Sequence, residues 1–244
     1  MTDSPQKRIL AALNLERHLT GRQLARLLYP EESESAEKIY QRTMKNLKTL
    51  ERAGLLKSDS YGVKMEGKEK FWRILATKTD SPKKRQLAVL EELGVTQTPW
   101  KIHSTLYEHE KACGDVFVSF AITSSLLEWQ GEGDQKSGFR HDRMFRFSDS
   151  INYLEMEMGN HGKDILRGKV KHYLALFRKT RRPFNVLFSL PTEQGLEDVV
   201  GIFDELGVGK QYGAVLQSEL VKDALSARVT HALDTITLQK FVKI

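Results

Sequence analysis

Apolar residues recur every three or four positions over the first thirty residues and predict two short helices. The first helix begins at the pair Ser4-Pro5, where a side-chain acceptor precedes a proline, and ends near Arg17. The second begins at Thr20-Gly21-Arg22-Gln23, which has the spacing of a capping box, and ends before Pro30. Both segments are therefore expected to be amphipathic helices packed on one core.

A third helix is predicted from Ser33 or Ser35 to Ala53, with Gly54 as a left-handed cap. Its apolar stripe consists of Ala36, Ile39, Tyr40, Thr43, Leu47 and Leu50. Its opposite face carries Lys38, Gln41, Arg42, Lys45, Asn46, Lys48 and Arg52. Such a face offers cations to phosphates and longer polar side chains to base edges in the major groove. An ordinary solvated helix face has the same pattern and is the alternative for a helix considered in isolation.

A β-hairpin is predicted after the third helix. A strand starts at Leu55-Leu56-Lys57-Ser58, a glycine-bounded basic segment covers residues 61–68, and a return strand covers residues 71–76. Three short helices followed by a hairpin predict a winged helix-turn-helix in residues 1–80. In that fold the third helix enters the major groove, and Lys64 and Lys68 of the wing reach flanking phosphates. Winged helices also mediate protein contacts, which is the alternative interpretation.

Residues 81–98 are predicted to form a connecting helix and a linker. The pair Ser81-Pro82 is a second helix start, and leucines follow at positions 87, 90 and 93. This leucine spacing fits packing onto either neighbouring domain, and it fits dimer formation equally well. A second domain is expected over residues 99–244.

The second domain alternates helical and strand patterns. We expect helices over residues 100–123, 164–179 and 197–206, and strands over residues 126–130, 139–147, 152–158, 184–190, 214–217 and 229–232. The first of these can run as one helix, but Gly114 weakens it in the middle, so a kink or break at that position is the alternative. The order helix, three strands, helix, strand predicts a mixed α+β or α/β domain with an αβββαβ core.

Three carboxylates of this domain are candidates for one site. Asp142 is expected on one central strand, while Glu155 and Glu157 alternate onto one face of the next strand. Oxygen ligands of this kind suit Mg²⁺ or Mn²⁺, which can orient a water molecule and stabilise charge on a phosphate. The alternative is that these acids line a solvent-facing surface of the sheet.

The charge distribution favours a polyanionic partner for the first domain. The net charge is +6, and residues 1–80 hold 16 basic and 11 acidic residues, against 22 and 21 in the remaining 164. A single cysteine, Cys113, excludes an internal disulfide and a paired-cysteine zinc site. The sequence has neither an apolar run of membrane-helix length nor a signal-peptide core at its beginning. We therefore expect a cytoplasmic protein that does not enter a membrane.

Several short motifs resemble the replication–relaxation family of plasmids, phages and other mobile elements. The resemblance covers about residues 5–190, and its motifs lie at residues 102–106, 127–132, 141–142, 154–159 and 169–173. It implies a winged helix-turn-helix followed by a restriction-endonuclease-like domain. It also implies DNA binding in replication, DNA relaxation or gene control.

The same resemblance places the nuclease-type aspartate at Asp142 and the first acid of the next strand at Glu155. Active nucleases of this fold usually have a lysine two residues later, where this chain has Glu157. Lys169, four residues before Tyr173, is similar to a helix motif of related nucleases and is the candidate replacement. The alternative is a lysine whose stem covers apolar surface while its ammonium reaches water. His161 is expected in the loop after the strand that carries Glu155 and Glu157. It lies either at the mouth of the pocket that the three carboxylates would form or in an ordinary turn.

These observations lead to one preferred function and two alternatives. We expect a homodimeric protein of a mobile element that binds double-stranded DNA and acts in replication or its control, with an inactive or regulatory nuclease-like domain. The first alternative is a nickase or endonuclease that uses Mg²⁺ or Mn²⁺ with Asp142, Glu155, Glu157 and Lys169. The second is a dimeric transcriptional repressor. The enzyme is an alternative and not the preferred function because the chain has Glu157 where active nucleases have a lysine.

Overall fold

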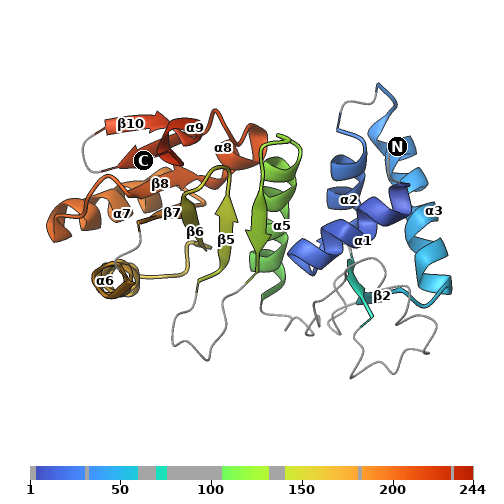
Figure 1. Cartoon of the computed structure of the whole chain (residues 1–244), viewed down its shortest axis with the longest axis horizontal. Coiled ribbons are helices and arrows are strands. Elements are labelled where there is room, and N and C mark those ends of the chain that lie inside the picture. The colour runs from blue at the N-terminus through green and yellow to red at the C-terminus, as the bar shows by residue number, and fades with distance from the viewer. Residues whose placement is uncertain are drawn as a thin grey trace. The chain divides into compact units, whose positions relative to one another are not determined.

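The chain divides into two compact units, Met1–Gly114 and Asp115–Ile244. The computed structural model describes residues 4–30, 33–59, 70–75, 106–131, 141–180, 183–231 and 234–243 (Figure 1). Both units contain helices and strands, which confirms the predicted mixed α and β class. The division falls within helix α5 (Tyr107–Ala121), whereas the predicted linker over residues 81–98 lies outside the described part of the chain.

The three N-terminal helices have the predicted boundaries. They are α1 (Pro5–Glu16), α2 (Gly21–Leu28) and α3 (Ala36–Arg52). Ser4 caps α1 by accepting a hydrogen bond from the amide of Lys7. Gly54, with φ of 72°, takes the left-handed conformation predicted for the end of the third helix.

A small antiparallel sheet completes the first unit. Its order is β1-β3-β2, formed by β1 (Leu19–Thr20), β2 (Leu56–Asp59) and β3 (Phe71–Ile74). The sequence pattern predicted β2 and β3 but not the two-residue β1. A buried ion pair joins the two longer strands, because Nε of Arg73 lies 2.6 Å from Oδ2 of Asp59.

The second unit contains a mixed seven-stranded sheet of order β10-β9-β8-β7-β6-β5-β4. Its strands are β4 (Glu128–Gln130), β5 (Arg143–Arg146), β6 (Ile151–Met156), β7 (Phe184–Leu190), β8 (Tyr212–Leu216), β9 (Arg228–His231) and β10 (Asp234–Thr237). The central strands β6, β7 and β8 are parallel, and the other neighbouring pairs are antiparallel. The pattern predicted every strand except β10.

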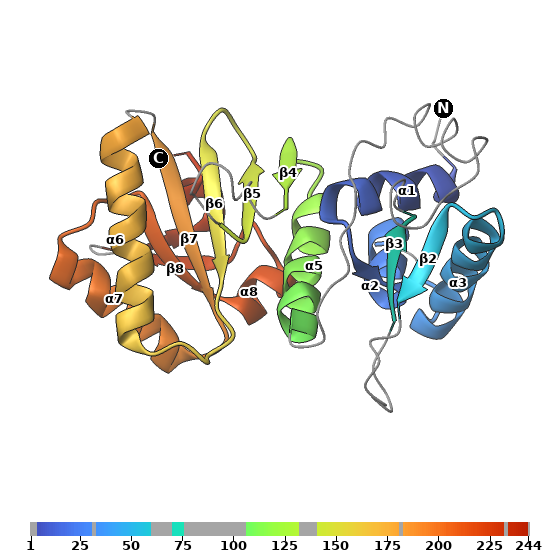
Figure 2. The same cartoon turned by 90° about the horizontal axis from the view of Figure 1, so that it is seen from below.

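Helices cover both faces of this sheet (Figure 2). On one face α6 (Lys163–Thr180) and α7 (Glu193–Leu206) pack in a core with β6, β7 and β8. On the other face lie the end of α5 and two short helices, α8 (Gln217–Lys222) and α9 (Leu238–Phe241). There Phe120 packs against Trp129 and Phe145, and the Ser119 hydroxyl donates to the carbonyl of Leu220 at 2.6 Å.

Helix α5 continues through Gly114 without a break, so the uninterrupted helix is the alternative that the structure bears out. A single glycine inside a helix costs about 1 kcal/mol, and the burial of Val116, Phe117 and Phe120 along the same helix offsets that cost. Within the part of the chain that the structure describes, no helix combines the length and the apolar character needed to cross a membrane.

Candidate functional site

Helix α3 separates an apolar face from a cationic one. Ile39, Thr43, Leu47 and Leu50 are buried against the first unit. The predicted polar positions lie on the opposite side, where Lys38, Gln41, Lys45 and Lys48 are exposed and Arg42 is half-buried. The predicted wing residues Lys64 and Lys68 lie outside the described residues.

Four of the predicted positions line one surface hollow of about 500 Å³, and two acidic residues line it with them. The lining consists of Glu34, Glu37, Lys38, Gln41, Arg42 and Lys45. The arrangement places carboxylates and cations side by side at the beginning of α3. Lys48, one turn farther along, does not line this hollow.

Two of these polar side chains make specific contacts. The guanidinium carbon of Arg42 lies 4.1 Å from the ring centroid of Tyr29, and its Nη2 lies 3.3 Å from Oε2 of Glu34. The Gln41 amide donates to Oε1 of Glu37 at 2.7 Å. The sequence pattern did not indicate a role for Tyr29, Glu34 or Glu37, although the four-residue spacing of Glu37 and Gln41 is a usable helix signal.

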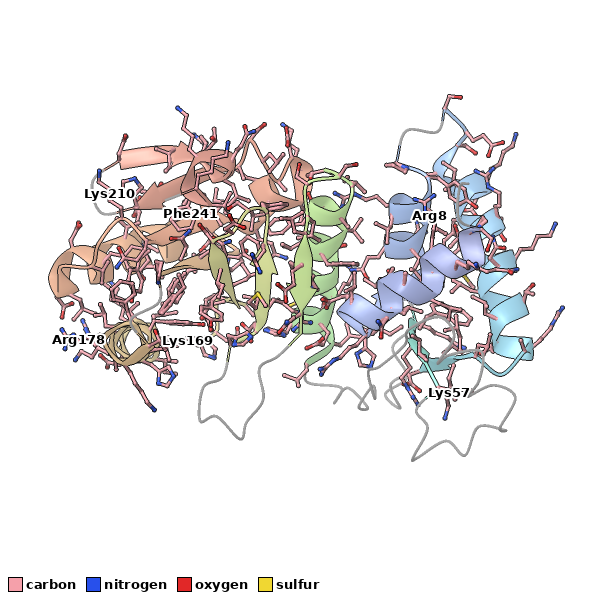
Figure 3. The ribbon with its side chains drawn as sticks, in the orientation of Figure 1. Arg8, Lys57, Lys169, Arg178, Lys210 and Phe241 are labelled. Carbon is pink, nitrogen blue, oxygen red and sulfur yellow. The ribbon has the colours of Figure 1, made fainter. Side chains whose placement is uncertain are left out.

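A second candidate site lies in the second unit, where α6 packs over β6. Glu155 lies in β6 and Glu157 directly follows it, while Lys169 and Tyr173 are one turn apart on α6. The Lys169 ammonium donates to Oε2 of Glu155 at 2.8 Å and to Oε1 of Glu157 at 2.6 Å. The Tyr173 hydroxyl donates to Oε1 of Glu155. In Figure 3 Lys169 and Arg178 leave α6 on opposite sides.

Asp142 lies immediately before β5, not within a central strand as the pattern predicted, because β5 begins at Arg143. Its Oδ2 accepts a hydrogen bond from the backbone amide of Met156 at 2.8 Å, which fixes the carboxylate beside the end of β6. Three of the predicted residues, Glu155, Glu157 and Lys169, are thus in direct contact. Asp142 is near enough for its charge to act on Glu155 and Lys169.

Carboxylates outnumber the Lys169 ammonium in this site, and the pKa values of its groups are shifted accordingly. Burial and the Asp142 carboxylate raise the pKa of Glu155 to about 7, against the opposing effect of Lys169. Burial acts to lower the pKa of Lys169, but the surrounding carboxylates outweigh it and hold that pKa well above its ordinary value. Burial and Glu155 raise the pKa of Tyr173 in turn. Glu155 can therefore exchange a proton near neutral pH, while Lys169 remains charged.

His161 lies beside the same site. Its Nδ1 is 2.6 Å from Oε2 of Glu157, so His161 and Lys169 engage both oxygens of that buried carboxylate. The His161 side chain is 42% exposed, which gives the cluster a path to solvent. Glu157 and His161 are four residues apart, but they lie at the end of a strand and in a loop. Outside a helix this spacing does not predict that two side chains are in contact.

The positive charge between the two glutamates is the Lys169 ammonium. Among the residues with described positions, no three histidine, cysteine, aspartate or glutamate side chains are arranged to hold a metal ion. Asp142 acts on Glu155 through its charge, and both oxygens of Glu155 accept hydrogen bonds, one from Lys169 and one from Tyr173. The described site can hold a proton, position an ammonium and present buried negative charge.

Much of the chain matches the model of a known protein family. A family model described as replication-relaxation matches residues 10–187, which run from α1 into β7. Comparisons with curated proteins and with solved structures gave no match.

Proposed function

Because this chain belongs to the replication-relaxation family, we propose that it binds double-stranded DNA and acts in the replication, or the control of replication, of a plasmid, phage or other mobile element. The first unit serves as a winged helix-turn-helix in this proposal. The element order α1-β1-α2-α3-β2-β3 and the antiparallel pairing of β2 with β3 support that role.

The cationic face of α3 is the observation that carries the proposal. Lys38, Lys45 and Lys48 extend into solvent from the side opposite the buried stripe. Ammonium groups in such a row neutralise phosphates, while Gln41 and Arg42 have the length to reach base edges. Lys64 and Lys68 are the proposed wing contacts to flanking phosphates.

A salt titration of DNA binding tests this proposal. Fluorescence anisotropy with a labelled duplex would compare wild type with a Lys45→Ala/Lys48→Ala variant between about 50 and 200 mM salt. The slope of log K against log salt is about −0.9 for each phosphate contact, so the loss of two contacts should make the slope less negative by about 2.

The matched control is Lys222→Ala/Lys240→Ala, which removes two exposed lysines from α8 and α9. This control should leave the slope as it is in wild type. An unchanged slope in the α3 variant would overturn the assignment of this face.

Metal-dependent DNA cleavage by the second unit is a second candidate, favoured by the contact of Lys169 with Glu155 and Glu157. In this candidate function Lys169 would replace the strand lysine that active nucleases use. Asp142 and Glu155 would hold a Mg²⁺ or Mn²⁺ ion, and the ion would activate water and stabilise phosphate charge. Magnesium commonly binds through one or two carboxylates with water and phosphate oxygens, so a third protein ligand is not required.

Incubation of supercoiled plasmid with the protein and Mn²⁺ tests this candidate. Nicking that Asp142→Ala and Glu155→Ala abolish, and that Lys171→Ala on the exposed side of α6 retains, is the expected result for an enzyme. Plasmid that stays supercoiled at every protein concentration would overturn it and leave a regulatory or DNA-contact role for this unit.

A further inference from the structure

We propose that Glu34 and Glu37 determine the sequence specificity of the DNA interface. In the free protein Glu34 binds Arg42 and Glu37 binds Gln41, and only a G·C base pair offers groups that can take the place of these contacts. This inference rests on the proposed DNA-binding function and deepens it. It starts from an observation independent of the lysines, namely that the longer polar side chains on α3 are bound by carboxylates of the same surface.

Arg42 is held in a fixed orientation. Its guanidinium carbon lies over the Tyr29 ring, 4.1 Å from the ring centroid, and Glu34 contacts one of its terminal nitrogens at 3.3 Å. A planar guanidinium presents two parallel donors, which match the O6 and N7 acceptors of guanine in the major groove. A stacked arginine loses less side-chain freedom on binding than a mobile one, because part of its ordering has already occurred.

Glu37 supplies the complementary chemistry. It accepts a hydrogen bond from Gln41 at 2.7 Å, and both residues line the same hollow as Arg42. In the major groove the amino group of cytosine is a donor that suits a carboxylate. A G·C pair therefore offers two neighbouring acceptors on one base to the Arg42 fork and a donor to the glutamate at once, whereas the acceptors of an A·T pair are separated by the adenine amino group.

The two carboxylates also penalise a complex that touches only the DNA backbone. A negative side chain on the binding face is repelled by phosphates, and it loses hydration when DNA covers it. At a sequence without the matching pair this cost is not recovered. The carboxylates thus weaken non-specific binding and leave binding to the matching sequence nearly intact, which raises the ratio between the two affinities.

The test uses the 244-residue chain and selection from a pool of DNA duplexes. The centre of each duplex is randomised over about 20 base pairs, which is enough to cover the site of one winged helix-turn-helix domain. Wild type and a Glu34→Gln/Glu37→Gln variant would each select a preferred duplex. Anisotropy would then give the affinities of both proteins for the wild-type-selected duplex and for a scrambled one. We expect wild type to enrich G·C pairs at defined positions. The variant should bind the scrambled duplex several-fold more tightly and lose about tenfold or more of the affinity ratio.

Two further variants make the outcome specific. Arg42→Lys keeps the positive charge but loses the planar fork, so it should lose the enriched guanine while still binding the scrambled duplex. Glu197→Gln removes the same charge from an exposed position on α7 and should leave the ratio unchanged. Glu34 and Glu37 are exposed, so their amide replacements should not disturb folding.

The possible results separate this inference from the function on which it rests. If wild type binds no duplex, or if the Lys45→Ala/Lys48→Ala variant binds with an unchanged salt slope, the DNA-binding proposal fails and this inference fails with it. If the lysine variant behaves as expected but the double glutamine variant keeps the affinity ratio of wild type, only the specificity role is overturned. Enrichment of sites built from A·T pairs alone would overturn it as well.

Discussion

Lys169 is the residue on which the charge balance of the second unit depends. Its single ammonium group contacts two buried glutamates, and Asp142 adds a third negative charge nearby. Full ionisation of all three carboxylates would leave uncompensated charge in a medium of low polarity, which is costly. The pKa of Glu155 rises to about 7 for this reason, so a bound proton supplies part of the missing positive charge near neutral pH.

This raised pKa predicts a pH-dependent loss of stability. Below its ordinary pKa of 4.5 the Glu155 carboxyl is protonated in both folded and unfolded states and costs nothing. As the pH rises to about 7 the unfolded chain ionises first, and the folded state loses relative stability. Glu155→Gln mimics the protonated form, so its advantage over wild type should grow by about 2 to 3 kcal/mol between about pH 5 and pH 8.

Urea unfolding of both proteins at the two pH values measures this change. A constant difference between wild type and Glu155→Gln across that interval would show that Glu155 has an ordinary pKa. Asp149→Asn, at a fully exposed acidic position, is the control and should show a much smaller change.

Removal of the Lys169 ammonium group should lower the free energy of unfolding more than removal of the Glu155 carboxylate. Lys169→Met leaves Glu155 and Glu157 buried without their cation, and breaking a buried pair on one side costs about 3 to 5 kcal/mol. The loss should be larger at about pH 8 than at about pH 5, where Glu155 is protonated. Lys171→Met, at an exposed position of the same helix, should change the free energy of unfolding by less than about 0.5 kcal/mol.

At the scale of the element, the start of α2 shows how local sequence fixes a helix. The backbone amide of Gln23 donates to Oγ1 of Thr20 at 3.2 Å, while the backbone amide of Thr20 donates to Oε1 of Gln23 at 2.8 Å. These reciprocal bonds satisfy two backbone donors that the first turn would otherwise leave without partners. The helix has only eight residues, too few to be stable by itself, so its cap and its packing must hold it.

Loss of this cap should lower stability measurably. Thr20→Ala is expected to reduce the free energy of unfolding by about 1 kcal/mol, and Thr20→Ser should recover most of the loss because it keeps the hydroxyl. Thr49→Ala is the matched control. Its hydroxyl only donates to the Lys45 carbonyl on the exposed surface of α3, so stability should stay within about 0.5 kcal/mol. Thermal or urea unfolding distinguishes these outcomes, and equal losses for the Thr20→Ala and Thr49→Ala variants would contradict the capping role.

At the scale of the whole molecule, the layered second unit depends on close approach between its sheet and the helices. Gly213 on β8 lies where α9 crosses the sheet. A Cβ there would collide with the Val229 side chain and would lie 2.9 Å from Cε2 of Phe241. The absence of a side chain therefore lets the buried ring of Phe241 pack directly on the strand.

Gly213→Ala should consequently destabilise the second unit by about 1 to 3 kcal/mol, the usual cost of overpacking. Gly201→Ala is the contrasting substitution, since a Cβ at this position of α7 meets no atom within 4 Å. It should raise stability by about 0.5 to 1 kcal/mol, because alanine restricts the unfolded chain and favours the helix. Denaturant unfolding of both variants checks the signs, and a stabilising effect at Gly213 would contradict the packing argument.

The sequence alone determined the features that depend on short-range periodicity and chain punctuation. The boundaries of α1, α2 and α3, the capping pair Thr20 and Gln23, and the left-handed Gly54 follow from residues a few positions apart. The cationic face of α3 follows in the same way, since helical geometry places residues three and four apart on one side. Burial of the whole of β7 was predictable from its continuous apolar run.

Tertiary structure alone decided which strands pair at the sheet edges and which side chains far apart in the sequence are in contact. The two-residue β1 is too short to carry a periodic signal, and β10 has only one apolar residue, Ile236, so neither shows an alternating pattern. Both are strands because neighbouring strands pair with them. Lys169 reaches Glu155 and Glu157 because the chain crosses from β6 through α6 to the parallel strand β7, which lays the helix over the acidic strand end. The shifted pKa of Glu155 follows from that packing and from burial, which no local pattern encodes. Local sequence sets conformation over a few residues, whereas contacts between distant residues depend on how the elements pack.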